Sequence, residues 1–215
     1  MNADVTKISD IFRFPIKQKG VFLKVIIGGI LSVLPFFHFL GIGYVMTIIK
    51  EAQEGKERSL PCWSAGNLFK YLKLGFMAFV IMAILSAPIF LILLISILFI
   101  FGLNLPFVGI MFILSAIVMM LLFAFILPFI IARYLDKEEL KAVAELPEIF
   151  MSIKNAGKTY IIGYFTILLI IVGIAVILGS FFPPLIAIIL GIFPIFYVGM
   201  VGARFIGELY IRGSK

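Results

Sequence analysis

Charge, cysteine and histidine are scarce in this chain of 215 residues. Charged residues make up 13% of the chain and hydrophobic residues 63%. In soluble domains about 25% of the residues are charged and about 45–50% are apolar. With a mean hydropathy of +1.23, this composition excludes an ordinary soluble protein. A single cysteine, Cys62, excludes an internal disulfide, and a single histidine leaves no Cys/His cluster for zinc. The composition therefore predicts a membrane protein with no metal or cofactor site.

Basic residues outnumber acidic ones, with 18 Lys and Arg against 11 Asp and Glu, and the net charge is +7. In a soluble protein this excess would suggest binding to nucleic acid. Here the basic residues flank apolar stretches, so the expected partners are membrane lipids, including anionic headgroups, and nucleic acid is not expected.

Four apolar stretches are long enough to cross a membrane. Each exceeds the roughly 20 residues that a helix needs to cross the hydrocarbon core. The stretches are residues 74–102, 106–132, 160–182 and 185–211. The connections at 103–106 and 180–184 are so short that the chain must reverse direction. The sequence therefore predicts two transmembrane helical hairpins.

A fifth apolar stretch, residues 25–49, is interrupted near its middle by Pro35, His38, Gly41 and Gly43. The distribution of basic residues helps to interpret it. All of them lie in residues 1–24, 50–73, 133–158 and 204–215. The positive-inside rule then predicts that these four clusters, and both termini, are cytoplasmic. This favours a re-entrant hairpin with residues 35–43 at its tip; the alternative is a fifth transmembrane helix with the N-terminus outside.

The predicted fold is a single all-α membrane domain, residues 1–215, in the cytoplasmic membrane of the cell. Leu140, Val143, Leu146, Phe150 and Ile153 recur at spacings of three and four, which is typical of an amphipathic helix in the interface. The expected segments are an interfacial helix in 1–20, a re-entrant hairpin at 21–49, a cytoplasmic loop with a short helix at 50–73, a transmembrane hairpin at 74–134, an amphipathic cytoplasmic segment at 135–158 and a second transmembrane hairpin at 159–211.

Several blocks of the sequence resemble a known family. They include Lys24-Val-Ile-Ile-Gly-Gly-Ile-Leu, Gly43-Tyr44, Ser59-Leu60-Pro61-Cys62-Trp63 and Gly202-Ala-Arg-Phe-Ile-Gly207-Glu-Leu-Tyr210. Together they resemble the prokaryotic membrane-protein family called Domain of Unknown Function 4013. Many members carry an acidic residue where this chain has Cys62, which argues against a charge-based role for that loop. The resemblance implies a multi-span bacterial or archaeal membrane protein and brings no activity with it.

Two groups of residues in the first third of the chain are candidates for function. Pro35, His38, Gly41 and Gly43 would form a gate or the tip of the hairpin, and His38 is either a proton relay or a neutral side chain bonded to a helix end. Trp63 is expected to be an interfacial anchor. Cys62 has no adjacent base, so we do not expect it to act as a nucleophile.

The last apolar stretch carries a stripe of small residues and a charge pair. Gly199, Ala203 and Gly207 recur every four residues and would let another helix approach closely, either within the protein or in an oligomer. Arg204 and Glu208 are also four residues apart, which predicts an ion pair at the cytoplasmic interface.

The four long stretches contain almost no ionisable residues away from their ends. Carriers of ions or polar solutes usually need such groups, and no acid/base pair or nucleophile forms a recognisable catalytic set. We therefore predict a non-enzymatic membrane scaffold or accessory subunit that contacts a partner membrane protein or a second copy of itself. The alternative is a channel or transporter for a small or lipid-like solute, gated at residues 35–43; a lipid-modifying enzyme is the least supported class.

Overall fold

A computed structural model describes residues 13–16, 18–56 and 59–214, and within these residues the fold is helical with no strand. The predicted all-α class is confirmed. The helices are α2 (Val21–Val33), α3 (His38–Gln53), α4 (Ala65–Ile97), the π-helical turn η1 (Leu98–Gly102), α5 (Pro106–Lys137), the 3-10 turn η2 (Leu140–Ala144), α6 (Leu146–Phe181) and α7 (Pro184–Gly213). Most of the predicted interfacial helix, residues 1–20, lies outside the described residues.

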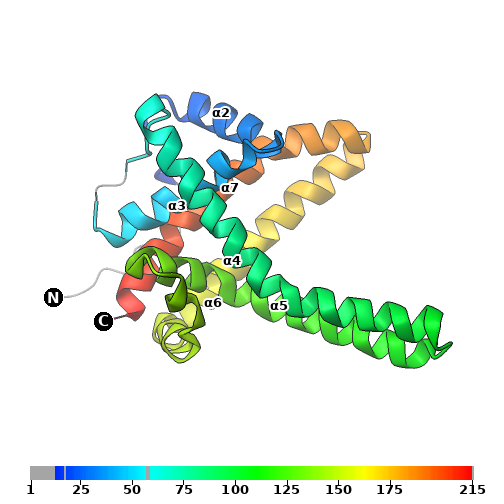
Figure 1. Cartoon of the computed structure of the whole chain (residues 1–215). Helices are drawn as coiled ribbons and strands as arrows, with labels where there is room; N and C mark the ends of the chain where they lie inside the picture. Colours follow the sequence, from blue (N-terminus) through cyan, green and yellow to red (C-terminus); the bar gives the residue numbers. More distant parts are fainter. Residues whose placement is uncertain (1–12, 17, 57–58, 215) are drawn as a thin grey trace.

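Four of these helices are long and apolar enough to cross a membrane: Ala65–Gly102, Pro106–Lys137, Leu146–Phe181 and Pro184–Gly213. They form two antiparallel pairs, α4 with α5 and α6 with α7, as the short connections predict. The tips of the two pairs lie on the same side of the molecule and diverge from each other (Figure 1). The prediction of four long apolar helices plus a shorter apolar one, α2, is thus confirmed.

Short-range backbone chemistry explains where the hairpins turn. Asn104 adopts a left-handed conformation with φ of 49°, which asparagine tolerates better than most residues. Pro106 and Pro184 each stand in the first turn of the following helix, where the missing N–H costs nothing.

Helices α2 and α3 form a helical hairpin whose turn is shorter than predicted. The turn covers residues 34–37, and Phe36 adopts a φ of 64° there. The prediction that the tip extends from Pro35 to Gly43 was wrong, because α3 already begins at His38 and contains both Gly41 and Gly43. These two glycines belong to helix contacts, described below, rather than to a turn.

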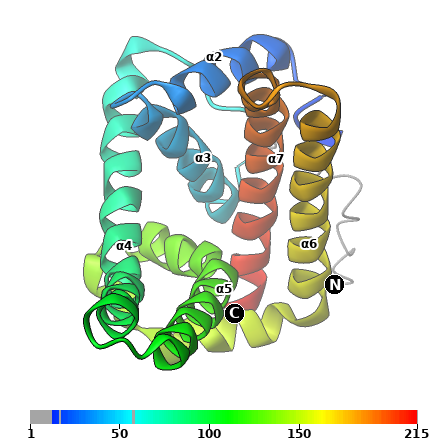
Figure 2. The same cartoon turned by 90° about the vertical axis from the view of Figure 1, so that its right-hand side faces the viewer.

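The connection between the two transmembrane pairs also differs from the prediction. Glu138, with φ of 56°, ends α5, and only a 3-10 turn separates it from α6. Of the five residues on which the predicted amphipathic helix rests, Leu140 and Val143 therefore lie in the 3-10 turn, and α6 begins only at Leu146. Inside α6 the helix is broken at Gly157, where φ is 53° and ψ is −136°. The part before Gly157 runs at an angle to the long part, across the bottom of Figure 2.

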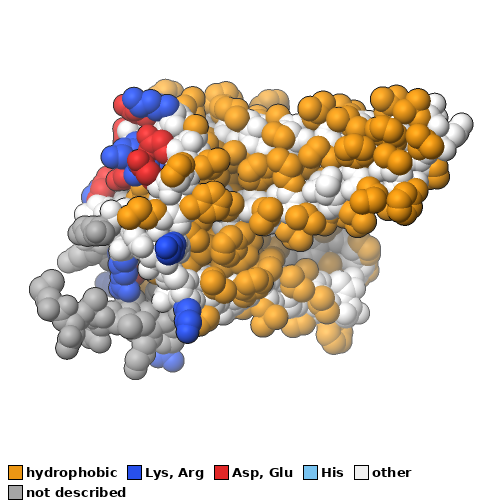
Figure 3. Space-filling model, turned by 90° about the horizontal axis from the view of Figure 1, so that it is seen from below, with side chains coloured by type: hydrophobic (Ala, Val, Ile, Leu, Met, Phe, Trp, Pro, Cys, Tyr) orange, Lys and Arg blue, Asp and Glu red, His pale blue; other side chains and the backbone are white. Residues whose placement is uncertain are grey.

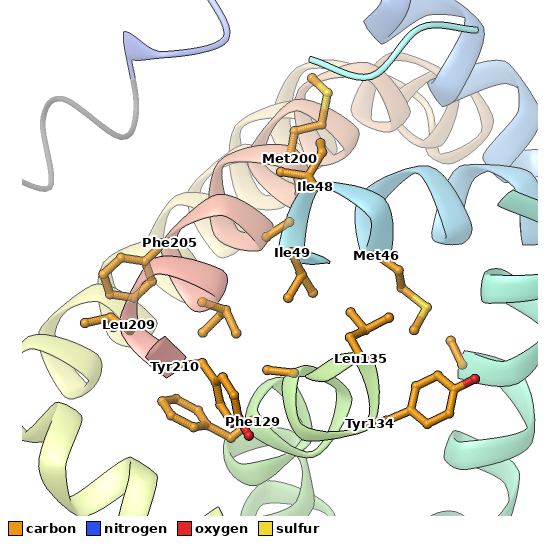
Figure 4. Packing of buried hydrophobic residues seen from close by; sticks show 14 of the residues in the cluster. Met46, Ile48, Ile49, Phe129, Tyr134, Leu135, Met200, Phe205, Leu209 and Tyr210 are labelled. Carbon is orange, nitrogen blue, oxygen red and sulfur yellow. The ribbon is translucent and has the colours of Figure 1, made fainter. Parts of the chain in front are cut away.

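The predicted boundary between a short helix ending at 73 and a span starting at 74 is absent, because α4 is continuous from Ala65. Helix α3 lies between α4 and α7 (Figure 2) and packs against both. On the face seen in Figure 3, charged side chains gather at one end and hydrophobic side chains cover the rest. We call this end the charged end; the core there contains Ile49, Phe129, Leu135 and Tyr210 (Figure 4).

Candidate functional site

An aromatic stack joins α3 to the loop before α4. The rings of Tyr44 and Trp63 lie nearly parallel, with centroids 4.4 Å apart and an interplanar angle of 9°. The indole Nε1 of Trp63 donates to the carbonyl of Lys24 at 3.3 Å. Trp63 therefore has a packing role inside the protein, and the predicted anchoring in the lipid interface stays a prediction.

Three successive carbonyls of this loop each accept a hydrogen bond from a different helix. Lys24 of α2 donates its ammonium to Leu60 at 2.7 Å, and Tyr44 of α3 donates its hydroxyl to Pro61 at 3.1 Å. The carbonyl of Cys62 accepts from Tyr71 of α4 at 2.8 Å. The loop thus fastens α2, α3 and α4 together, and we call residues 60–63 the clasp. The thiol of Cys62 is exposed.

Beneath the clasp, α3 and α4 approach each other through glycine. A Cβ built on Gly43 would lie 1.8 Å from the carbonyl oxygen of Tyr71, and one on Gly75 would lie 1.9 Å from that of Phe39. Both obstacles are backbone atoms, so a side chain fits at neither position unless the helices separate. Gly41 faces α2 instead, where a Cβ would lie 2.2 Å from Ser32 Oγ.

The predicted gate residues are therefore not gathered at one point. Pro35 is exposed in the turn, and His38 is half-buried at the start of α3 with its ring 4.0 Å from that of Phe39. Gly41 and Gly43 are buried further along α3, three and five residues after His38. The four residues share a hairpin, but two of them serve helix packing.

The charge pair of α7 is close and mostly buried. Arg204 Nε lies 2.7 Å from Glu208 Oε1, and Arg204 is only 5% exposed. Its Nη2 also donates to the carbonyl of Lys56 at 3.0 Å. Arg204 therefore holds the segment after α3 against α7, a contact that the spacing of residues in the sequence does not reveal.

A second arginine network was not predicted. Arg133, near the end of α5, pairs with Glu145 and Glu148 of the following segment. Its Nη1 reaches the hydroxyl of Tyr210 at 3.4 Å, and that hydroxyl donates to Asp136 Oδ2 at 3.2 Å. The sequence showed a cluster of carboxylates after α5 and a basic residue at the end of the span, but not that the chain folds back to pair them.

A polar pocket lies where α3 and α5 end. It has a volume of about 390 Å³ and is lined by Lys50, Gln53, Glu54, Leu135, Asp136, Lys137 and Glu138. Lys50 is paired with Glu138, and this hydrogen bond lowers the pKa of the Glu138 carboxyl below its ordinary value. Gln53 donates from Nε2 to the carbonyl of Ala132 at 2.7 Å, whereas its Oε1 is buried and has no hydrogen-bond partner among the residues that the structure describes.

The predicted stripe of small residues on α7 has two different environments. At Gly207 a Cβ would lie 2.5 Å from the Cβ of Ala52 on α3, and Ala203 is 4% exposed. At Gly199 nothing lies within 4 Å of an added Cβ. The stripe is therefore an internal contact with α3 at one end and faces open space at the other.

Gly199 faces an apolar cavity of about 590 Å³. The cavity lies between the α2–α3 hairpin and the α6–α7 hairpin, with Ile131 of α5 also in its wall, and among the described residues that line it Ser32 alone has a polar side chain. The sequence could not reveal it, because the walls come from five helices, α2, α3, α5, α6 and α7, whose relative placement is set by packing.

Among residues 13–16, 18–56 and 59–214, no three His, Cys, Asp or Glu side chains gather as a metal site would require. At the charged end, the guanidinium groups of Arg133 and Arg204 are paired with carboxylates of the same chain. The fold and these sites define a multi-pass helical membrane protein. Ion pairs join the segments at its charged end, and an apolar cavity lies between its helices.

Comparison with known proteins agrees with this class. The model of the family described as Protein of unknown function (DUF4013) matches residues 27–183, so the chain belongs to this family. The resemblance expected from the Gly43-Tyr44 and clasp blocks is thereby confirmed. No curated protein and no solved structure matches the chain.

Proposed function

We propose that this protein is a non-enzymatic membrane scaffold or accessory subunit that acts through helix packing and contacts with lipid. The observation that supports the proposal best is the pairing of its charged groups. Arg204 is paired with Glu208, and Arg133 with Glu145 and Glu148. Charged groups that neutralise one another join segments of the charged end, whereas a site for polar chemistry presents its charged groups to a substrate.

The partners in this proposal are membrane lipids and a second membrane protein, or another copy of the chain. Outside the charged end, many large hydrophobic side chains are exposed, among them Phe101 and Phe107 at the tip of the α4–α5 hairpin. A helical partner could pack there in the bilayer, where small differences in side-chain packing decide which helices associate.

Native mass spectrometry of the protein extracted gently in its own lipids tests this function. A stoichiometric foreign membrane subunit, or a stable homo-oligomer without flux activity, is the expected result. Two results together would overturn the proposal. The protein would be a monomer without a partner after several mild extractions, and deletion of its gene would leave every membrane complex of the cell unchanged in size.

We propose further that the charged end is cytoplasmic and that the α2–α3 hairpin is re-entrant. The two helices have 13 and 16 residues, fewer than the roughly 20 that a single crossing needs, and the turn between them returns the chain. Basic residues at both ends of the hairpin then lie on one side of the membrane.

Labelling with an impermeant maleimide tests this topology. In a Cys62→Ser background we expect Lys19→Cys to stay unlabelled on intact cells and to react in inverted vesicles. Leu103→Cys, at the tip of the α4–α5 hairpin, is the control that should react on intact cells. Labelling of Lys19→Cys from outside would show that α2 and α3 cross the membrane as one span.

A second candidate function is supported by the apolar cavity, which borders the α2–α3 hairpin at Ser32 and Gly41. A channel or transporter for a lipid-like solute could use such a cavity, with the turn at Pro35 and His38 as its gate. Proteoliposomes that move a fluorescent lipid between leaflets, with slower movement after His38→Leu, would favour this function over the scaffold.

A further inference from the structure

The apolar cavity and the polar pocket lie end to end along the same helix faces. On α3, Ile42, Met46 and Ile49 line the cavity and Lys50 and Gln53 line the pocket. Steps of three and four residues keep Ile42, Met46, Ile49 and Gln53 on one face of the helix. On α5, Ile131 lines the cavity, and Leu135, one turn later, lines the pocket. The cavity is apolar and the neighbouring pocket at the charged end is polar, so the two spaces differ in polarity as the two ends of an amphiphile do.

The dimensions of the cavity fit a lipid chain rather than a helix. From Gly41 to Ile49 the cavity follows α3 for about 12 Å, close to the roughly 15 Å of one leaflet's hydrocarbon. A partner helix about 10 Å across would need roughly 900 Å³ over that length, which exceeds the cavity's 590 Å³.

Water is a poor occupant of the same cavity. Its one polar side chain, Ser32, already donates its hydroxyl to the carbonyl of Gly28 at 2.7 Å, and a buried water needs two to four polar partners. An apolar cavity inside a bilayer is therefore filled by hydrocarbon.

The polar pocket specifies the headgroup. It holds two cations, Lys50 and Lys137, and three carboxylates, those of Glu54, Asp136 and Glu138. Both signs are present, which complements a zwitterion. The ammonium of Lys50 is paired with Glu138, but an ammonium has three donors and can also bind a phosphate oxygen.

Gln53 makes the headgroup more specific. Its Oε1 is buried and has no hydrogen-bond partner, and a buried acceptor without a donor costs stability. A primary ammonium supplies N–H donors, whereas a trimethylated ammonium supplies none.

We infer that the cavity and the pocket together bind one zwitterionic phospholipid with a primary ammonium headgroup. One acyl chain occupies the cavity, the phosphate lies near Lys50 and Lys137, and the ammonium donates to Gln53 Oε1 beside Glu54 and Asp136. This inference goes beyond the proposed function, since either a scaffold or a transporter could hold such a lipid.

Native mass spectrometry of the delipidated full chain, with three phospholipids of identical acyl chains as probes, tests the inference. We expect one phosphatidylethanolamine to be retained at least about tenfold more tightly than phosphatidylcholine, which lacks the N–H donors. Tenfold is the factor that one hydrogen bond to a charged group supplies. Phosphatidylglycerol, which lacks the positive charge, should also bind more weakly. Equal retention of the three probes by the wild-type protein would overturn the inference.

Variants separate the two halves of the site. Gly199→Leu should fill the cavity and reduce retention of all three lipids about tenfold or more, because a buried leucine displaces several methylene groups of the chain. Gly173→Leu is the matched control, since Gly173 also has nothing within 4 Å and does not line the cavity. Gln53→Leu should remove the preference for phosphatidylethanolamine over phosphatidylcholine and leave chain binding in place.

Ala175→Leu enters the cavity from α6 and gives a second filling variant if Gly199→Leu does not fold. Unchanged lipid retention in a folded filling variant, or an unchanged lipid preference in Gln53→Leu, would overturn the inference. Either failure would leave the scaffold proposal standing, because that proposal is tested by protein partners and not by a bound lipid.

Discussion

The closest backbone contact between helices offers the sharpest test of this fold. Gly43 of α3 faces the backbone of Tyr71, and Gly75 of α4 faces the backbone of Phe39. The two contacts are reciprocal and lie four residues apart on each helix. Gly43→Ala adds a single methyl group to the middle of this crossing and changes no charge and no hydrogen bond directly.

The magnitude follows from the distances. The new Cβ would lie 1.8 Å from the Tyr71 carbonyl oxygen, and ordinary contact begins at 3.4 Å, so the helices must move apart by up to 1.6 Å. A gap of about 0.5–1 Å already removes a quarter to a half of the dispersion energy of the atoms that face it. Overpacking of this kind usually costs about 1–3 kcal/mol and sometimes more. Because backbone blocks both positions, we expect about 3 kcal/mol for Gly43→Ala.

Unfolding in mixed micelles with increasing SDS, followed by fluorescence, measures this cost. Trp63 is the only tryptophan and stacks on Tyr44, next to Gly43, so its emission reports on the affected region. Gly66→Ala is the control in α4, where nothing lies within 4 Å of an added Cβ; there alanine should stabilise the helix by up to about 1 kcal/mol.

The double variant Gly43→Ala/Gly75→Ala gives a second check. Once one substitution has separated the helices, the other has less left to disrupt, so the combined cost should fall short of the sum. If Gly43→Ala is as stable as Gly66→Ala, or if the two costs simply add, then α3 and α4 do not cross at these glycines.

Three further predictions concern the charged end and the clasp. Arg204→Ala should lower the free energy of unfolding by about 2 kcal/mol, because it removes the charge-assisted hydrogen bonds of Arg204 to Glu208 and to the carbonyl of Lys56. The exposed Lys137→Ala should change it by less than about 0.5 kcal/mol; SDS unfolding compares the two variants, and equal costs would contradict the contribution of the buried arginine. The pKa of Glu138 is lower in the folded protein than in the unfolded chain. Its contribution to the free energy of unfolding is therefore fully present above the unfolded pKa of about 4.3 and is lost as pH falls through the folded pKa. Its exposed pair with Lys50 is worth at most about 1 kcal/mol, so Glu138→Gln should lose slightly less stability than the wild type on acidification, as thermal melts at neutral and acidic pH would show; an identical loss would refute this. Trp63→Ala should cost about 3 kcal/mol and Trp63→Phe clearly less, since only the latter keeps a ring on Tyr44; circular dichroism melts decide, and a harmless Trp63→Ala would mean that the clasp does not depend on the stack.

The elements predicted well are those that depend on local sequence. The four spans follow from uninterrupted hydrophobic length, and the two tight connections follow from residues such as Asn104 and Pro106 that favour a turn and a helix start. Membership of the family was readable from the Gly43-Tyr44 block and the clasp. None of these inferences needs to know which helix lies beside which.

The extent of the hairpin tip could not be predicted, because a glycine has two common uses. It permits a turn, and it permits a close approach of two backbones. Near Pro35 and His38 the first use seemed natural for Gly41 and Gly43, yet the structure shows the second. The distinguishing facts are the positions of residues on other helices, Tyr71 of α4 for Gly43 and Ser32 of α2 for Gly41.

The same limit applies to α7, where the sequence contains one stripe and the structure contains two surfaces. Gly207 packs on α3 and Ala203 is buried, so that end of the stripe is already used within the chain. An oligomer formed through the whole stripe would have to displace α3, and with it the contact between Arg204 and Lys56. Gly199 remains open, but it opens onto the apolar cavity. If α7 takes part in an assembly, the contact therefore has to involve the cavity end of the helix, where a lipid chain and a partner helix would compete for the same space.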